Sequence, residues 1–202
     1  MKAVVLISGN GSNLQSIIDN AVKINLQISC VISNNPLAYG LKRAEKSNIQ
    51  NCIVDSKNFS SKEDYDKELI QKINQHEPEL IILAGFMRIL TPLFTSYFFG
   101  KILNIHPSLL PKFPGLNTHQ KVIEASEKYH GATVHFVTQE LDGGPIINQT
   151  SVEVMSSDTV KTLAAKILEK EHVLYSEVIH WYTEKRLKLN KNMTVTLNGK
   201  VI

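Results

Sequence analysis

The fold of this chain is decided near its N-terminus by Ala3-Val4-Val5-Leu6-Ile7-Ser8-Gly9-Asn10-Gly11-Ser12-Asn13. The first five residues are apolar and mostly β-branched, which predicts a buried strand that ends at the glycines. From Ser12 to Val22 the apolar residues recur as on one face of a helix. These apolar residues are Leu14, Ile17, Ile18 and Val22. A buried strand, a glycine turn and an amphipathic helix are typical of the start of a parallel α/β sheet.

The rest of the first half continues the alternation of strands and helices. We expect strands at residues 28–32, 52–54, 80–84 and 102–105, and helices at residues 38–47 and 62–74. Continuous apolar strands separated by helices predict a parallel sheet with helices on both faces. Ligands of such sheets bind beyond the carboxyl ends of the strands.

The second half has a different pattern. Strand-like residues 133–137 and 146–154 flank Asp142-Gly143-Gly144-Pro145, which predicts an antiparallel hairpin with a long loop. A long helix is expected at residues 160–185, and a terminal hairpin at residues 187–189 and 194–197. The predicted fold class is therefore α/β, an open, mostly parallel, twisted Rossmann-like sheet with an antiparallel hairpin in the C-terminal half.

Composition limits the classes of function. The chain has 202 residues, 43% of them hydrophobic and 20% charged, as expected of one folded domain. The net charge of +3 and the lack of a Lys/Arg run argue against nucleic-acid or membrane-surface binding. We expect Cys30 and Cys52 to be buried free thiols. The opening apolar run is too short for a signal peptide or a spanning helix, so we expect a cytoplasmic protein.

The glycine loop from Gly9 to Asn13 suits an anion. Glycines let the backbone approach a ligand, and the N–H groups and dipole of the following helix face it. A nucleotide P-loop would need Gly-Lys-Ser/Thr, and a dinucleotide fingerprint a third glycine where Leu14 stands. The loop therefore indicates a phosphate rather than a dinucleotide, and a tight turn capped by Ser or Asn remains the alternative.

The strand end Asn104-Ile105-His106-Pro107 carries two hydrogen-bonding side chains. Strand alternation places Asn104 and His106 on one face, and Pro107 keeps His106 extended. An amide can hold a carbonyl oxygen that becomes negative, and an imidazole can donate to it or move protons. This pair suits acyl transfer, although Asn and His that satisfy backbone groups would give the same pattern.

Asp142 is the candidate partner of His106. A carboxylate on a glycine-rich loop can reach into a cleft, fix the protonation of an imidazole and accept a proton from an amine. An ordinary Asp-Gly turn is the alternative.

Two further segments indicate ligand contacts. The stretch from Leu83 to Leu90 is a strand end and an apolar turn that could offer backbone groups to a flat heterocycle, or be a core crossover. Glu171 falls within the apolar stripe of the long helix and needs a partner there, unless it lies at the stripe edge. That stripe comprises Val160, Leu163, Ile167, Leu174, Val178 and Trp181. The histidines show no metal-site spacing, and His130 and His135 lack an obvious third ligand.

Taken together, four segments resemble the phosphoribosylglycinamide formyltransferase family. They are Val5 to Gln15, Leu83 to Leu90, Asn104 to Pro111 and Leu141 to Pro145. The resemblance extends from Lys2 to about Leu189. The His-Pro-Ser-Leu-Leu-Pro motif marks the wider formyltransferase group, whereas the glycine loop with Ser12 and Asn13 points to the glycinamide ribonucleotide members.

The resemblance implies the function and the role of each site residue. The chain would transfer the formyl group of 10-formyltetrahydrofolate, its co-substrate, to the amine of 5'-phosphoribosylglycinamide, without a metal. The catalytic residues would be Asn104, His106 and Asp142. The ribonucleotide would be bound by Gly11, Ser12, Asn13, Pro107 and Glu171. The folate would be bound by Met87, Arg88, Ile89, Leu90, Asn104, Thr138, Glu140, Leu141 and Asp142.

The same resemblance implies an organisation and a set of partners. We expect one formyltransferase domain, 1–202, with a phosphate-binding half, 1–100, and a catalytic and folate-binding half, 101–190. The partners would be the two small-molecule substrates, with no nucleic acid and no membrane, and the protein a monomer or weak homodimer. One departure is Asn117, where similar proteins often carry His.

Three other functions compete with this one. An initiator-tRNA formyltransferase should have a further C-terminal domain and a more basic surface. A formyltetrahydrofolate hydrolase should have an N-terminal regulatory domain. A non-catalytic nucleotide-binding module would keep the glycine loop but would not need Asn104, His106 and Asp142 together.

Overall fold

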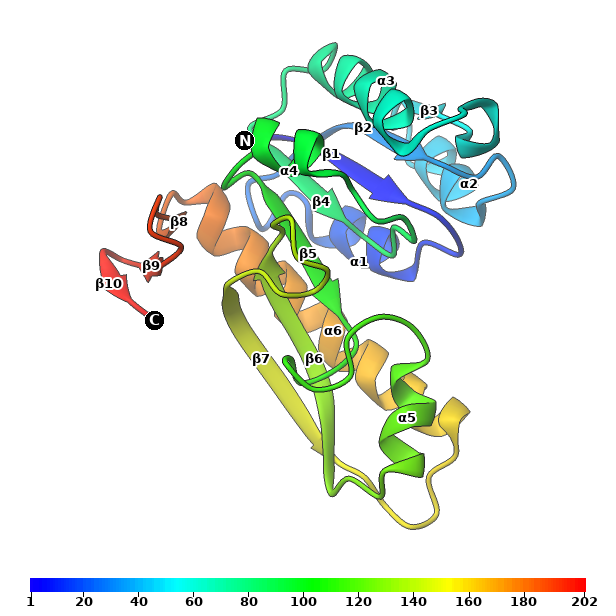
Figure 1. Ribbon diagram of the computed structural model, residues 1–202, viewed down its shortest axis with the longest axis vertical. Coiled ribbons are helices and arrows are strands. Elements are labelled where there is room, and N and C mark those ends of the chain that lie inside the picture. The colour runs from blue at the N-terminus through cyan, green and yellow to red at the C-terminus, as the bar shows by residue number, and fades with distance from the viewer. The chain divides into compact units, whose positions relative to one another are not determined.

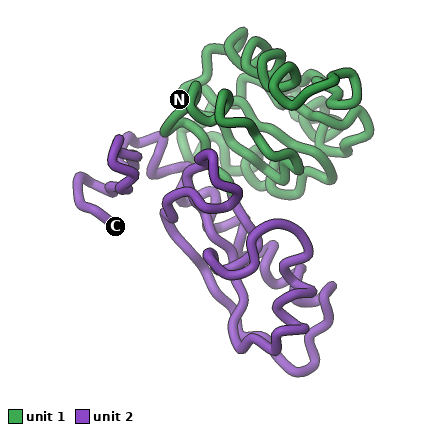
Figure 2. The backbone as a smooth tube through the Cα atoms, viewed as in Figure 1, with its two compact units in different colours: residues 1–104 green, residues 105–202 purple.

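The computed structural model describes all residues, 1–202. Seven strands form one sheet in the order β3-β2-β1-β4-β5-β6-β7, and three form a second sheet in the order β10-β9-β8. The chain divides into two compact units, residues 1–104 and 105–202 (Figure 2). The predicted fold class is confirmed: the larger sheet is mostly parallel and ends in an antiparallel pair.

The strands of the first unit are parallel. They are β1 (Lys2–Ile7), β2 (Gln27–Ser33), β3 (Asn51–Ile53), β4 (Leu80–Leu83) and the start of β5 (Ile102–His106). Ala3 to Ile7 and Leu80 to Leu83 are buried, as expected of strands covered on both faces. The carboxyl ends of β1 and β4 carry the glycine loop and the Met87 turn, so both segments lie at one edge of the sheet.

Helices cover both faces of these strands. They are α1 (Ser12–Asn20), α2 (Tyr39–Lys46), the 3-10 turn η1 (Ser56–Asn58), α3 (Lys62–Asn74) and α4 (Pro92–Tyr97). The α1 helix packs against α2, and α3 packs against α4. Right-handed crossovers place the two pairs on opposite faces, as Figure 1 shows for α1 and α3.

The first helix is shorter than its sequence pattern predicts. It ends at Asn20, and Val22, which was expected in its apolar stripe, is 93% exposed. The chain turns at Ala21, whose carbonyl accepts the N–H of Leu26, and the buried side chains Ile24 and Leu26 cover the core instead. The expectation for Val22 was wrong because the chain leaves the helix after Asn20, so Val22 does not lie on the apolar face of the helix.

The second unit is built on an antiparallel hairpin. It contains α5 (Thr118–Glu124), β6 (Tyr129–Phe136), β7 (Ile146–Glu153) and α6 (Val160–Thr183). The α6 helix packs on both strands of the hairpin (Figure 1). A capping box between Thr159 and Thr162 fixes its first turn. The predicted stripe of α6 is buried except at its ends, because Val160 is exposed and Trp181 is half-buried.

The remaining strands form a small separate sheet. The predicted terminal hairpin is present as β8 (Leu187–Leu189) and β9 (Val195–Leu197). A third strand, β10 (Lys200–Val201), was not predicted, because two residues carry no periodicity. No helix in the chain has both the length and the apolar character needed to cross a bilayer.

Candidate active site

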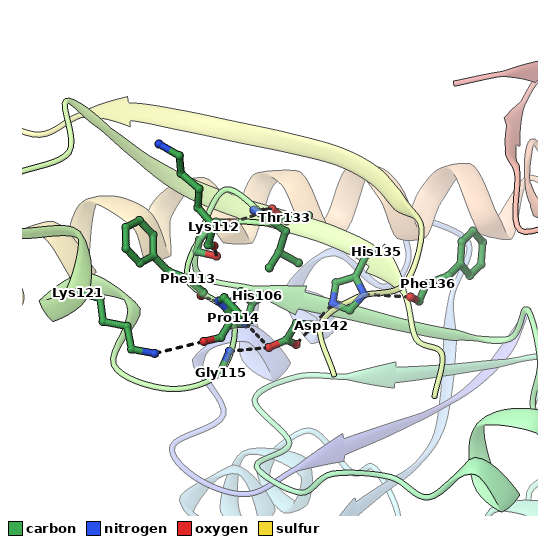
Figure 3. A network of polar contacts seen from close by, with 12 residues as sticks. His106, Lys112, Phe113, Pro114, Gly115, Lys121, Thr133, His135, Phe136 and Asp142 are labelled. Atoms are coloured by element: carbon green, nitrogen blue, oxygen red, sulfur yellow. Dashed lines mark hydrogen bonds and ion pairs between the residues drawn. The ribbon is translucent and has the colours of Figure 1, made fainter. Parts of the chain in front are cut away.

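The structure brings together two side chains that are 36 residues apart in the sequence, His106 at the end of β5 and Asp142 in the loop between β6 and β7. His106 Nδ1 lies 3.4 Å from Asp142 Oδ2, and the side chains are only 7% and 10% exposed (Figure 3). The other ring nitrogen, Nε2, lies 3.0 Å from the carbonyl oxygen of Phe113. Both ring nitrogens therefore face oxygen atoms that can accept a hydrogen bond.

The two glycines that follow Asp142 allow its loop to adopt this position. A side chain at Gly144 would overlap the carbonyl of Phe136, and one at Gly143 would crowd the side chain of Glu140. Asp142 itself has a φ of 50°, in the left-handed region that Asp tolerates better than most residues. The Asp-Gly-Gly sequence thus allows the loop to fold back on the end of β6 and point its carboxylate at His106.

The loop of residues 107–117 provides the other contacts of this pair. The N–H of Gly115 donates to Asp142 Oδ2 at 2.9 Å, and the Phe113 carbonyl accepts from His106. Phe113, Gly115 and Asn117 all have positive φ, of 55°, 77° and 60°. Sequence reasoning missed Phe113 and Gly115 because they act through backbone groups, whose partners depend on the path of the loop. Asn117 is the left-handed residue before α5, a position that suits Asn.

His135 is a second imidazole beside Asp142. Its Nε2 lies 3.9 Å from Asp142 Oδ1, and its Nδ1 lies 3.0 Å from the Phe136 carbonyl. Burial lowers the pKa of His135, and the neutral ring places its proton on Nδ1, toward that carbonyl. The carboxylate is therefore left to pair with His106 rather than with His135. Sequence reasoning considered His135 only as a possible metal ligand together with His130, and so missed its place beside Asp142.

Two more histidines of this unit form a pair. His119 Nδ1 and His130 Nε2 are 2.9 Å apart. Burial, and then the neighbouring His119, lower the pKa of His130 to about 4. Because His130 Nδ1 is buried without a hydrogen-bond partner, the tautomer with its proton on Nε2 is favoured, and it donates to His119.

Asn104 is half-buried in β5, two residues before His106. The alternation along the strand places both side chains on the same face. The predicted catalytic residues thus come from one strand end and one loop, and their roles remain predictions.

The glycine loop of the first unit is a tightly packed turn. Gly11, with a φ of 76°, occupies the N-cap position of α1 and gives no side-chain cap. A Cβ on Gly11 would lie 2.7 Å from Gly40 Cα in α2. Arg43 of α2 donates from Nε to the backbone oxygen and from Nη2 to the side-chain oxygen of Asn10, both at 2.9 Å. The α1 helix therefore begins at Ser12 without a side-chain cap. The alternative interpretation of the loop, a tight turn capped by Ser or Asn, included such a cap.

The predicted folate segments expose apolar side chains. Met87 and Ile89 are exposed, whereas Leu90 is buried, and the guanidinium of Arg88 lies 4.3 Å from the centre of the Tyr65 ring. The N–H of Met87 donates to Ser8 Oγ at 2.7 Å. The exposure of Met87 and Ile89 argues against the alternative of a core crossover at the end of β4.

The other predicted contacts lie in the second unit. In its loop 137–145, Leu141 and Glu140 are exposed and Thr138 is half-buried. Pro107 is half-buried after β5, and Glu171 is 7% exposed in the middle of α6, within the apolar stripe. No group of three or more His, Cys, Asp or Glu side chains is arranged to hold a metal ion. Cys30 is buried and Cys52 half-buried, and both are free thiols.

Comparisons with known proteins agree on one family. A family model described as Formyl transferase matches residues 1–179. Phosphoribosylglycinamide formyltransferase of Escherichia coli (strain K12) is 48% identical over 194 residues, which cover 95% of this chain and 92% of that protein. The Haemophilus influenzae protein of the same name is 48% identical over 203 residues, covering 100% and 95%. The solved structure of the Coxiella burnetii enzyme in complex with CHES has a TM-score of 0.96 and 45% identity, covering 100% and 95%. The chain belongs to the formyl transferase family, among the phosphoribosylglycinamide formyltransferases.

Proposed function

We propose that this protein transfers the formyl group of 10-formyltetrahydrofolate to the amine of 5'-phosphoribosylglycinamide. The products are N-formylglycinamide ribonucleotide and tetrahydrofolate, in de novo purine biosynthesis. Membership of the family supports this function. The single structural observation that carries it is the nearly buried pair of His106 and Asp142, with 3.4 Å between Nδ1 and Oδ2.

The ribonucleotide binds through the start of α1. The backbone N–H groups of Gly11, Ser12 and Asn13 point along the helix axis and meet the phosphate, which the positive end of the helix dipole favours. Arg43, which holds Asn10, adds a positive charge close to this loop. Pro107 and Glu171 complete the contacts to the ribonucleotide, and the low exposure of Glu171 suits a carboxylate that meets a ligand hydroxyl or amine.

The folate binds against apolar surface and backbone groups. Met87, Arg88, Ile89 and Leu90 supply one side of this contact, and the exposed Met87 and Ile89 offer apolar area to a flat ring. Loop residues Thr138, Glu140, Leu141 and Asp142, together with Asn104, supply polar contacts to the pterin.

Catalysis is direct transfer in two steps. The amine nitrogen attacks the formyl carbon, a C–N bond forms, and the carbonyl electron pair moves to oxygen. The side chains of Asn104 and His106 stabilise that oxyanion. Asp142 orients the His106 ring and accepts the proton lost by the amine, directly or through one water. The oxyanion then reforms the carbonyl, the bond to N10 breaks, and N10 takes up the proton that Asp142 received from the amine, directly or through water.

We propose that the active unit is the whole domain, 1–202, in two functional halves, 1–100 and 101–190. It acts on small molecules, without nucleic acid or membrane, as a monomer or weak homodimer in the cytoplasm. The modest net charge of +3 supports the absence of a nucleic-acid partner.

A reconstituted assay tests this function. Purified protein receives glycinamide ribonucleotide and 10-formyltetrahydrofolate, and each substrate is omitted in turn. We expect tetrahydrofolate and formylated ribonucleotide in equal amounts, and neither product when one substrate is missing. Tetrahydrofolate formed at the same rate without the ribonucleotide would identify a hydrolase instead.

The His106→Ala variant separates an enzyme from a binding module. Loss of general acid–base and electrostatic help lowers kcat by about 10²–10⁴-fold, while ribonucleotide affinity measured by calorimetry stays within about twofold. His76→Ala, in the other unit, is the matched control and keeps wild-type turnover. Unchanged turnover in His106→Ala would contradict the proposed mechanism.

A further inference from the structure

We infer that Gln149 is a positioning residue for the proposed reaction. With Thr133 it clamps the 107–117 loop, whose backbone holds the His106–Asp142 pair. This inference rests on the proposed function, but its structural part concerns contacts within the second unit only.

The clamp is centred on the hydroxyl of Thr133, which is completely buried in β6. Its Oγ1 donates to the carbonyl oxygen of Ser108 at 2.6 Å and accepts the N–H of Leu110 at 3.1 Å. It also accepts from Gln149 Nε2 at 2.8 Å. A hydroxyl has one donor and two acceptor positions, so all three are in use.

Gln149 reaches this hydroxyl from the neighbouring strand. Thr133 and Gln149 are direct partners in the β6–β7 register. The second proton of Gln149 Nε2 goes to the carbonyl oxygen of Leu110 at 2.9 Å. The amide thus ties the first part of the loop to the hairpin at two points, although Gln149 lies on the exposed face of β7.

The tied segment leads directly to the reacting pair. Ser108 Oγ donates to the Lys112 carbonyl at 2.7 Å, and the Lys112 N–H donates to the Leu109 carbonyl at 3.0 Å. The next residue, Phe113, accepts from His106 Nε2, and Gly115 then donates to Asp142 (Figure 3). Both backbone contacts of the pair therefore come from a segment whose start is fixed by Thr133 and Gln149.

The loop needs such ties because part of it is strained. Phe113 is a bulky non-glycine residue with a φ of 55°, in the left-handed region that such residues rarely adopt. Without the clamp the loop can relax, which moves the Phe113 carbonyl away from His106 Nε2. A displacement of about 1 Å at a reacting group can cost about 10²-fold in rate.

Three variants at position 149 test the clamp. Gln149→Leu removes the donor, Gln149→Glu replaces it with an acceptor of the same shape, and Gln149→Lys restores a donor. Ser151→Ala is the matched control, because Ser151 is exposed on the same face of β7. We expect kcat to fall about 5–50-fold in Gln149→Leu and further in Gln149→Glu, where a carboxylate would face the Leu110 carbonyl.

The same variants separate positioning from general damage. We expect both KM values to stay within about twofold, the melting temperature to change by no more than about 2 °C, and Gln149→Lys to regain most of kcat. Equal kcat for Gln149→Glu and wild type would overturn the inference. A loss of kcat that follows the loss of melting temperature, without rescue by Gln149→Lys, would also overturn it.

A spectroscopic measurement on the substrate-free protein is independent of activity. The ¹⁵N resonances of the His106 ring, recorded at one fixed pH, report the hydrogen bond from Nε2. We expect them to move in Gln149→Glu and to be unchanged in Ser151→Ala. If wild type has no formyl transfer activity but these resonances move, the proposed function fails and the clamp stands. Unmoved resonances contradict the clamp whatever the activity.

Discussion

At the scale of single residues, the orientation of the His106 ring follows from its two neighbours. Asp142 lies on its Nδ1 side and the Phe113 carbonyl on its Nε2 side, so each ring nitrogen has an acceptor within 3.4 Å. These two contacts, one at each nitrogen, fix the orientation of the ring in a nearly buried site. An imidazole held in one orientation suits the acyl transfer that we propose for this site.

Gly11 gives the first prediction at this scale. Gly11→Ala meets both a φ of 76° and the Gly40 backbone 2.7 Å from the added Cβ, whereas Gly199→Ala meets a φ of 78° with open space around it. We expect urea denaturation to show a loss of about 1 kcal/mol for Gly199→Ala and about 2–4 kcal/mol for Gly11→Ala.

The binding of the ribonucleotide provides the second measurement on these variants. KM for the ribonucleotide should rise at least about tenfold in Gly11→Ala, because the N–H groups at the start of α1 are displaced, and stay unchanged in Gly199→Ala. Equal stability losses in the two variants would contradict the close approach of α1 and α2.

The sequence indicated which side chains meet at the site, but not which backbone groups contact them. The types and the strand alternation of Asn104 and His106 indicated a shared face, and the Asp-Gly-Gly loop indicated a reaching carboxylate. The contacts of Phe113 and Gly115 depend on a loop with several positive φ values, for which the sequence offered only Gly115 as a signal. Gln149 was missed because an exposed glutamine on an edge strand looks like solvated surface.

At the scale of elements, β6 and α5 bring two imidazoles together. His130 is buried in β6 and hydrogen-bonds to His119 of α5. Burial and the neighbouring His119 lower the pKa of His130 from 6.5 to about 4. The contact between these two elements therefore requires a neutral ring.

This pKa shift predicts how stability depends on pH. Between pH 6.5 and 4 the unfolded chain binds a proton at His130 that the folded chain does not, so the free energy of unfolding falls as the pH falls. We expect wild type to lose roughly 1–3 kcal/mol more than His130→Phe between pH 7 and pH 4.5. Urea denaturation at several pH values measures the difference. Parallel pH profiles for the two proteins would show that His130 is not the titrating group.

Elements whose apolar residues recur with a clear period were predictable from the sequence, and short elements were not. The expected helix at residues 62–74 coincides with α3, because its apolar spacing and its Ser61 cap agree. The six- and seven-residue helices α4 and α5 have too few turns for a visible period. Val22 was misplaced because an apolar residue at helical spacing does not show where the chain leaves the helix.

At the scale of the whole molecule, the charge argues against a nucleic-acid partner, and the fold class indicates where ligands bind. The chain carries 22 Lys and Arg against 19 Asp and Glu, which is far from the surface of a nucleic-acid-binding protein. The parallel sheet places the glycine loop at the carboxyl end of β1, where ligands of such sheets bind. The sequence predicted this architecture because continuous apolar strands leave few other arrangements.

The ribonucleotide should stabilise the folded chain, and a dinucleotide should not. Glycinamide ribonucleotide at about 100 times its Kd adds about 2.7 kcal/mol, which raises Tm by roughly 5–10 °C for a protein of this size. NAD at the same concentration should leave Tm unchanged, because the loop lacks the third glycine of a dinucleotide site. Thermal unfolding followed by circular dichroism measures both, and an equal rise with NAD would contradict the assignment of the loop.

The cooperation of His106 and Asp142 is tested most directly by a double-mutant cycle on single-turnover formyl transfer. The rate would be measured for wild type, His106→Ala, Asp142→Asn and the double variant, each saturated with both substrates. Because the carboxylate acts largely through the ring, we predict that the double variant is about as slow as the slower single variant. If the two losses multiply, so that each residue acts without the other, the account of a paired acid and base is contradicted.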